Sequence, residues 1–186
     1  MRKGTFSAGC IVIEYGGQPM VLPTGKAFKW AFQRIATPAT PLEDLQAYFD
    51  ALSPVRAINL IVLHHTGTDT PFRGIDTWYD IDRYHRSKGW KGIGYHYGID
   101  PAGSIWSLRP SRLIGSHAEG HNALSLGIVV WGNKTKTDAQ YDALNRLLKV
   151  LQKRFPSAKV ALHSHLKKTE CPSLDTKRLK EVRWYK

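Results

Sequence analysis

The stretch HSHLKKTECPS, residues 163–173, places imidazole and thiol side chains close together directly after a short apolar run. His163 ends the run and Cys171 follows eight residues later, so one loop could bring both side chains onto a single ion. Imidazole and thiolate suit zinc, which needs no redox chemistry. Taken alone the pair is a weak signal, because a His and a Cys near each other in sequence are more often unrelated than ligands.

A third ligand is available in NLIVLHHTGT, residues 59–68. Side chains alternate along a strand, so the adjacent His64 and His65 point to opposite faces and only one of them can join the site. The alternation alone does not say whether His64 or His65 is the ligand. One histidine of this pair, together with His163 and Cys171, gives three protein ligands, and no second cysteine lies near enough in sequence to close a four-ligand site. Three ligands with an open fourth position are typical of catalytic zinc.

Strands and helices alternate in the part of the chain that must position these residues. This order, with one hairpin, predicts the α/β class: a single central mixed β-sheet flanked by helices, formed by residues 56–186, with residues 1–55 as a small N-terminal extension of unknown role. The expected strands are 58–65, 95–99, 104–108, 127–131 and 158–163, and the expected helices are 75–88 and 137–155.

Local signals define several of these elements. Gly103 lies in a D-P-A-G turn and is expected to take a positive φ, and Thr137 with Gln140 forms a capping box at the start of the second helix. In the extension we expect a hairpin over 10–22, a short helix over 27–35, and a helix that begins at a capping box of Thr40 and Glu43 and stops at Pro54.

Composition and charge set bounds on function. The chain has 186 residues, 42% of them apolar, which is enough for one substantial core. Of the net charge of +12, residues 134–186 carry +9, from 14 basic and 5 acidic side chains. Such a field favours an anionic partner, whether nucleic acid, an acidic membrane surface or an anionic wall polymer. A basic face that only keeps the protein in solution explains the charge equally well.

Cysteine usage and hydropathy point to a soluble protein. Cys10 and Cys171 cannot make a disulfide framework, and a reducing compartment during synthesis fits best. No stretch is long enough to span a membrane. The apolar run near the N-terminus is short and interrupted, so we expect no secretory signal.

Four segments together resemble the zinc N-acetylmuramoyl-L-alanine amidases, a family that includes phage lysozyme-type amidases and animal peptidoglycan recognition proteins. The resemblance covers roughly residues 58–180 and rests on four motifs in the right order and spacing, where any one alone would be unspecific. The segments are LHHTGT, YHRSKGWKGIGYHYGIDPAGSI (84–105), IGSHAEGHNALSLGIVVWGN (114–133) and HSHLKKTECPSLDTKRL.

The resemblance implies a ligand set. Carried over position by position, it makes His64, His163 and Cys171 the zinc ligands. The cytoplasmic recycling amidases of the family differ, since they have an aspartate in place of the cysteine and a glutamate where this chain has Val129. The chain therefore resembles the tyrosine-assisted members.

Four further residues receive roles from the same resemblance. Tyr95 matches the tyrosine placed near the zinc-bound water, although a half-buried strand aromatic is the commoner fate of a tyrosine. Thr169 stands where the phage lysozyme-type amidases have a lysine, and matches the catalytic recognition proteins. We expect Tyr95 and Thr169 to be catalytic by stabilising negative charge. His117 and Asn122 match positions that line the glycan–peptide groove and are expected to bind substrate.

The remaining histidines and three of the tryptophans have ordinary explanations. We assign the histidines to packing, hydrogen bonding or solvent, since the ligand count is already met, and the tryptophans to core or rim, although one of them could also stack on a sugar face of the substrate. These residues are His65, His85, His96, His121 and His165, with Trp78, Trp90 and Trp106.

The resemblance implies a peptidoglycan hydrolase that uses zinc-activated water to cleave the amide bond between N-acetylmuramic acid and L-alanine. We expect a monomeric phage endolysin, made in the host cytoplasm and acting on the wall at lysis, with anionic envelope polymers or lipids as further partners of the basic C-terminal third. A non-catalytic peptidoglycan-binding module is the alternative, but such relatives generally lose the cysteine. A nucleic-acid binder ranks last: there is no recognised motif, and much of the basic excess falls on helix 137–155 and an expected C-terminal helix.

Overall fold

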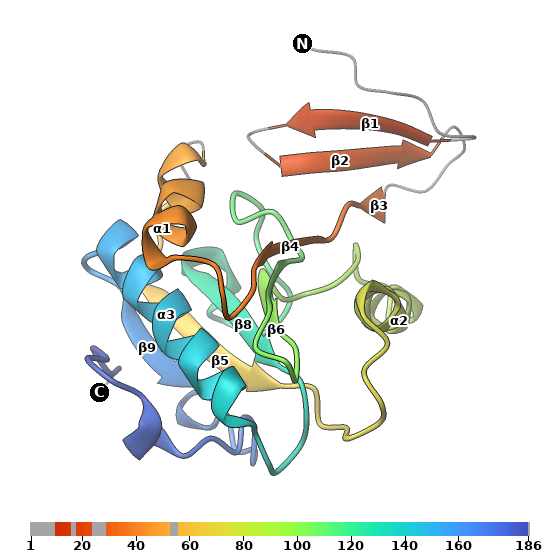
Figure 1. Ribbon diagram of the computed structural model, residues 1–186. Helices are drawn as coiled ribbons and strands as arrows, with labels where there is room; N and C mark the ends of the chain where they lie inside the picture. The colour runs from red at the N-terminus through yellow and green to blue at the C-terminus, as the bar shows by residue number, and fades with distance from the viewer. Residues whose placement is uncertain (1–9, 16–17, 24–28, 53–55, 186) are drawn as a thin grey trace.

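The main body of the protein is a mixed six-stranded sheet with helices on both faces (Figure 1). The computed structural model describes residues 10–15, 18–23, 29–52 and 56–185. Strand order is β4-β7-β6-β8-β5-β9, with β5 parallel to β8 and β9, β6 parallel to β8, and β7 antiparallel to β4 and β6. The strands are β4 (Gln33–Ala36), β5 (Leu60–His65), β6 (Tyr97–Ile99), β7 (Ile105–Ser107), β8 (Ser125–Val130) and β9 (Lys159–Leu162). The predicted central mixed sheet is confirmed.

Helices cover the two faces unequally. Helices α1 (Leu42–Ala51) and α3 (Asp138–Arg154) lie together on one face, and α2 (Ile75–Ser87) lies apart from them on the other (Figure 1). The predicted capping box of α3 is present: Gln140 N–H donates to Thr137 Oγ1 at 3.1 Å, and Thr137 N–H donates to Gln140 Oε1 at 2.9 Å. No helix in the described ranges has both the length and the apolar character needed to cross a bilayer.

Strand β5 sends its side chains to two different cores. Ile61 and Leu63 belong to the large core beneath α1 and α3, whereas Leu60 and Val62 pack with Ala118 on the opposite face. Because side chains alternate along the strand, His64 extends the second face and His65 the first. Strand register therefore turns His64 toward the loop that contains Ala118.

The N-terminal portion follows the predictions only in part. Strands β1 (Cys10–Tyr15) and β2 (Gln18–Pro23) pair antiparallel as the predicted hairpin, whose Gly16-Gly17 turn lies outside the described residues. The predicted helix over 27–35 is wrong, since the described part of that stretch holds β3 (Lys29–Trp30) and β4. β4 adds to the edge of the main sheet by pairing with β7, and these long-range hydrogen bonds outweigh local helix propensity.

Two further predictions were wrong: the capping box at the start of α1 and the C-terminal helix. Thr40 does not cap α1: its Oγ1 accepts the N–H of Thr37 at 2.9 Å, and the helix begins at Leu42 behind Pro41 without a side-chain cap. α1 ends at Ala51, and Pro54 is outside the described residues. The expected C-terminal helix is replaced, in the described residues up to 185, by a short 3-10 turn over Thr176–Arg178. The division of the chain at residue 55 stays a prediction.

The segment that leads into Tyr95 is fastened to α2 by buried side chains. Asp82 Oδ1 accepts the N–H of Ile93 at 2.6 Å, and His85 Nδ1 accepts the N–H of Gly94 at 3.0 Å. Burial lowers the pKa of His85 to about 4, against an opposing effect of the Asp82 carboxylate. His85 is therefore neutral at neutral pH, as an acceptor at Nδ1 must be.

This depressed pKa predicts a pH dependence of stability. His85 takes up a proton near pH 6.5 in the unfolded chain but only near 4 in the folded one. Its contribution is fully present above about pH 6.5 and is lost as the pH falls toward about 4. His85→Asn keeps an acceptor oxygen near the place of Nδ1 without the titration. Between about pH 7 and pH 5 we expect the free energy of unfolding, measured with urea, to fall by ~2 kcal/mol less in the variant than in the wild type. Equal losses would contradict this assignment.

Candidate metal centre

Three side chains converge at the carboxyl ends of the neighbouring strands β5 and β9. His64 is near the end of β5, His163 directly follows β9, and Cys171 returns on the next loop. Their potential ligand atoms all lie within 4.8 Å of one another. Within the described ranges, this is the one group of three or more His, Cys, Asp or Glu side chains arranged to hold a metal ion.

The Cys171 loop is held against the sheet by hydrogen bonds. Ser164 N–H donates to the carbonyl oxygen of Cys171 at 2.9 Å, and His65 N–H donates to its Sγ at 3.4 Å. Thr169 braces the same loop, because its Oγ1 accepts the N–H of Cys171 at 3.2 Å. The thiol is thus placed by backbone contacts from both strand ends.

The two ring nitrogens of His64 face different partners. Nδ1 lies 3.9 Å from Sγ of Cys171, on the side of the ligand cluster. Nε2 lies 3.1 Å from Nδ1 of His117, and Nε2 of His117 lies 3.3 Å from Oγ of Ser125. Nδ1 is therefore the nitrogen of His64 that is available to a metal.

Burial sets the protonation of the cluster. It lowers the pKa of His64 well below its usual value, with the neighbouring His117 and His163 acting in the same direction. Burial likewise lowers the pKa of His163 and brings that of His117 to about 3. Burial raises the pKa of Cys171, opposed by the His65 N–H. Neutral imidazoles are the form that binds metal, and a bound cation favours the thiolate, so this donor set fits zinc.

Tyr95 lies beside the cluster. Its ring centroid is 5.2 Å from that of His64 and 5.5 Å from that of His85. Burial, followed by the nearby Cys171 and Tyr84, raises the pKa of the phenol. The hydroxyl therefore keeps its proton at neutral pH and can donate a hydrogen bond.

The two residues expected to line the substrate groove have structural contacts as well. Asn122 Oδ1 accepts the N–H groups of His117 and Ala118, both at 2.9 Å, and so shapes the loop before β8. His117 is 9% exposed. Both residues border a hollow of about 540 Å³ next to the cluster, lined by Trp90, Ser116, His117, Ala118, Glu119, Gly120, Asn122, His163 and Lys167. Their contact with substrate stays a prediction.

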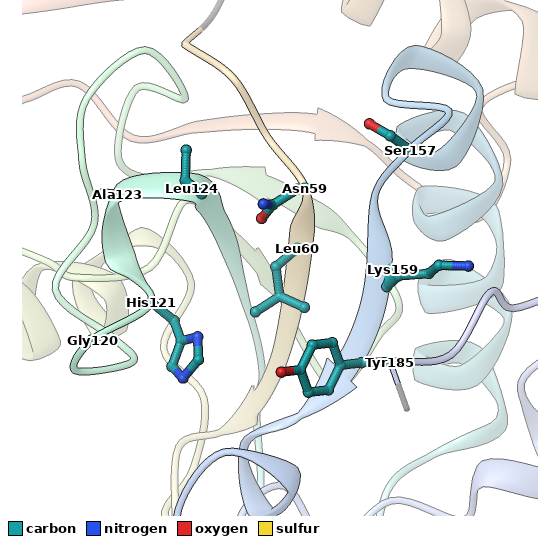
Figure 2. Close-up of a pocket in the computed structure, with 9 residues that line it drawn as sticks. All are labelled: Asn59, Leu60, Gly120, His121, Ala123, Leu124, Ser157, Lys159 and Tyr185. Carbon is teal, nitrogen blue, oxygen red and sulfur yellow. The ribbon is translucent and has the colours of Figure 1, made fainter.

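A second hollow lies across the same loop, at the amino ends of β5 and β9. Its volume is about 450 Å³, and Figure 2 shows the rings of His121 and Tyr185 flanking Leu60 there. The lining contains one imidazole but no carboxylate and no thiol. It therefore lacks the donor set of the metal centre.

Three residues that lie near the site, or near His117 beside it, were not foreseen from the sequence. Ser125 contacts His117, and Arg56 donates to the carbonyl oxygen of Ser125 at 2.6 Å. Lys136 lies close enough to Cys171 for the two charges to influence each other, and burial lowers its pKa. No local motif marks these residues, because a serine at a strand start and basic residues in loops are common.

The other histidines and tryptophans divide as expected between core and surface. His96 is fully buried, and its Nδ1 accepts the N–H of Gly127 at 2.9 Å. Trp78 and Trp106 are buried, whereas Trp90 is 42% exposed on the hollow beside His163.

Comparison with known proteins finds similar phage endolysins. Endolysin of Escherichia phage T7 is 34% identical over 107 residues, which cover 53% of this chain and 71% of the relative. Endolysin of Enterobacteria phage T3 is 30% identical over 131 residues, covering 66% and 86%. Among solved structures, the endolysin N-acetylmuramoyl-L-alanine amidase LysCS from Clostridium intestinale superposes with a TM-score of 0.58 at 34% identity, covering 66% of this chain and 81% of that one.

Animal proteins share the fold. Wild-type Drosophila PGRP-LB superposes with a TM-score of 0.62 at 25% identity, covering 70% of this chain and 84% of that one. The family model described as N-acetylmuramoyl-L-alanine amidase matches residues 54–174, which include all three converging side chains. The chain therefore belongs to the N-acetylmuramoyl-L-alanine amidase family.

Proposed function

We propose that this protein is a zinc-dependent N-acetylmuramoyl-L-alanine amidase that cleaves peptidoglycan as an endolysin. The observation that carries the proposal is the convergence of His64, His163 and Cys171 within 4.8 Å in a chain of this family. A structural zinc site is usually closed by a fourth protein ligand, and within the described residues no fourth His, Cys, Asp or Glu joins this group.

The chain's own residues divide the work. His64, His163 and Cys171 would hold zinc, and two neutral imidazoles with one thiolate leave the site a net positive charge. Zinc in such a site lowers the pKa of water from 15.7 toward ~7, which supplies a nucleophile at neutral pH. The bond that breaks joins the lactyl carbonyl carbon of muramic acid to the nitrogen of L-alanine.

Tyr95 and Thr169 are suited to stabilise the amide oxygen as it gains negative charge. The raised pKa of Tyr95 keeps its hydroxyl protonated, so the residue is a donor beside the cluster. The Thr169 hydroxyl oxygen accepts the backbone N–H of Cys171, so the hydroxyl proton of Thr169 can still be donated. A well-placed donor of this kind is worth on the order of 100-fold in rate.

The hollow beside His163 is the proposed seat of the substrate. The exposed Trp90 offers an aromatic face to a sugar ring, and Lys167 offers a charge to the carboxylates of a stem peptide. In this proposal the loop that carries His117 and Asn122, and that Asn122 holds by its hydrogen bond to the His117 N–H, forms another wall of the hollow.

Two features support a lytic enzyme over a binding module. The thiol ligand, which non-catalytic relatives generally lose, is present as Cys171, and it lies within the cluster. The phage relatives are named endolysins.

We infer that the protein is made in the host cytoplasm and reaches the wall at lysis, and that it acts as a monomer.

Metal removal tests this function. Chelation should abolish lysis of cell walls, and added zinc should restore it. Cys171→Ala should lose both metal and activity, because the thiolate is one of three ligands.

Tyr95→Phe should keep zinc and fold but lose on the order of 100-fold in rate, since only the donor is removed.

The adjacent histidine supplies the matched control for metal binding. His65→Ala should retain zinc, because this side chain points to the other face of β5, whereas His64→Ala should release it. Metal content is measured on purified protein by elemental analysis. Full activity in Cys171→Ala, or zinc loss in His65→Ala but not in His64→Ala, would contradict the assignment.

A second inference concerns the basic surface. Lys149, Lys153 and Lys180 border a hollow between α3 and the C-terminal segment, where they are placed to meet anionic wall polymers or lipids. Arg154, on the same helix, does not border this hollow and donates to the carbonyl oxygen of Leu52 at 2.8 Å.

If these lysines guide the enzyme to an anionic envelope, lysis of whole walls should fall as salt rises, because exposed charges interact over a Debye length of ~8 Å at physiological ionic strength. Replacing the three lysines by glutamine should weaken wall binding and flatten that salt dependence. Hydrolysis of a small soluble muropeptide should hardly change in either test. Equal salt sensitivity on both substrates would show that salt acts on the fold or the active centre.

A further inference from the structure

We propose that His117 is a positioning residue of the metal centre: it accepts a hydrogen bond from Nε2 of His64 and thereby fixes the tautomer that leaves Nδ1 of His64 free for zinc. This inference rests on the proposed zinc site. It gives His117 a role in the metal centre, in addition to the place in the groove wall that the family resemblance implies.

The direction of the hydrogen bond follows from what each nitrogen faces. Nδ1 of His64 lies on the side of Cys171, 3.9 Å from its Sγ, and a nitrogen that binds metal carries no proton. The single proton of a neutral His64 ring must then be on Nε2. Nε2 lies 3.1 Å from Nδ1 of His117, so His64 donates and His117 accepts.

The tautomer of the His117 ring is determined in the same way. With Nδ1 accepting, a neutral His117 carries its proton on Nε2, which lies 3.3 Å from Oγ of Ser125. Ser125 is fully buried and its hydroxyl oxygen can accept. One chain of donors and acceptors therefore runs from the ligand cluster through His64 and His117 to Ser125.

The fold holds the His117 ring where this chain requires it. An ideal Cβ built at Gly115 or at Gly127 would come within 2.6 Å of the ring, so the ring packs directly on glycine backbone. Asn122 Oδ1 accepts the backbone N–H of His117 at 2.9 Å. The ring has little room to turn away from His64.

An imidazole in this place differs from the more common partner of a ligand histidine. Such partners are often carboxylates, which orient the ring and also add negative charge near the metal. A neutral His117 orients His64 without adding charge. The positive charge left by zinc and one thiolate is then undiminished, which favours activation of water.

Zinc affinity measures this role without relying on turnover. The zinc dissociation constant is obtained by competition with a chromophoric chelator for the wild type, His117→Leu and His117→Asn. The leucine variant removes the acceptor and should weaken zinc binding roughly 10- to 100-fold. The asparagine variant places an amide oxygen near the position of Nδ1 and should recover much of the loss. His121→Ala, a histidine on the same loop that faces the other hollow, should bind zinc as the wild type does.

Tautomers are read directly from the wild type. In nitrogen-labelled, zinc-loaded protein, NMR should show His117 with a bare Nδ1 and a protonated Nε2, and this measurement remains available if the leucine variant fails to fold. Wild-type affinity in His117→Leu with only a higher KM, or a protonated Nδ1 on His117, would overturn the inference. A wild type that binds no zinc, or His64→Ala binding it equally well, would instead refute the proposed zinc site, and the role of His117 with it.

Discussion

The parallel pairing of β5 with β9 is the constraint on which the candidate site depends. Leu63 lies opposite Leu162 in this ladder, so the residues that follow, His64 and His163, emerge side by side with ring centroids 4.5 Å apart. A slip of one residue would turn His64 to the opposite face and bring His65 in its place. The fully buried apolar residues of β5 oppose such a slip, because it would exchange the two cores that the strand separates.

Burial then determines the chemistry that the paired strands can support. Imidazoles taken out of water lose the protonated form, which is why the pKa values of His64 and His117 are lowered. The same desolvation raises the pKa of Cys171 and of the Tyr95 phenol. One physical cause thus prepares neutral ligands, a thiol that a cation would ionise, and a hydroxyl that stays a donor. The proposed amidase chemistry needs all three.

Much of this arrangement could be predicted from the sequence, where strong local patterns coincide with tertiary structure. The continuous apolar run before His64 and the capped α3 are of that kind. Predictions failed where contacts that no local pattern reveals decide the outcome: β4 forms because it pairs with the distant β7, and Thr40 bonds its near neighbour Thr37 in preference to capping α1. The contact of Ser125 with His117 was beyond prediction for the same reason, since the hydrogen bond depends on a packed ring and not on any motif.

Mass spectrometry of peptidoglycan digested in isotopically labelled water tests the central claim most directly. Hydrolysis of the muramoyl–alanine amide adds a water oxygen to the acyl carbon. We therefore expect peptides with an unlabelled L-alanine amino terminus, and glycan strands whose lactyl carboxylate carries a heavy oxygen, with neither product formed by Cys171→Ala. Label at a sugar reducing end, or muropeptides with the stem still attached to muramic acid, would contradict it.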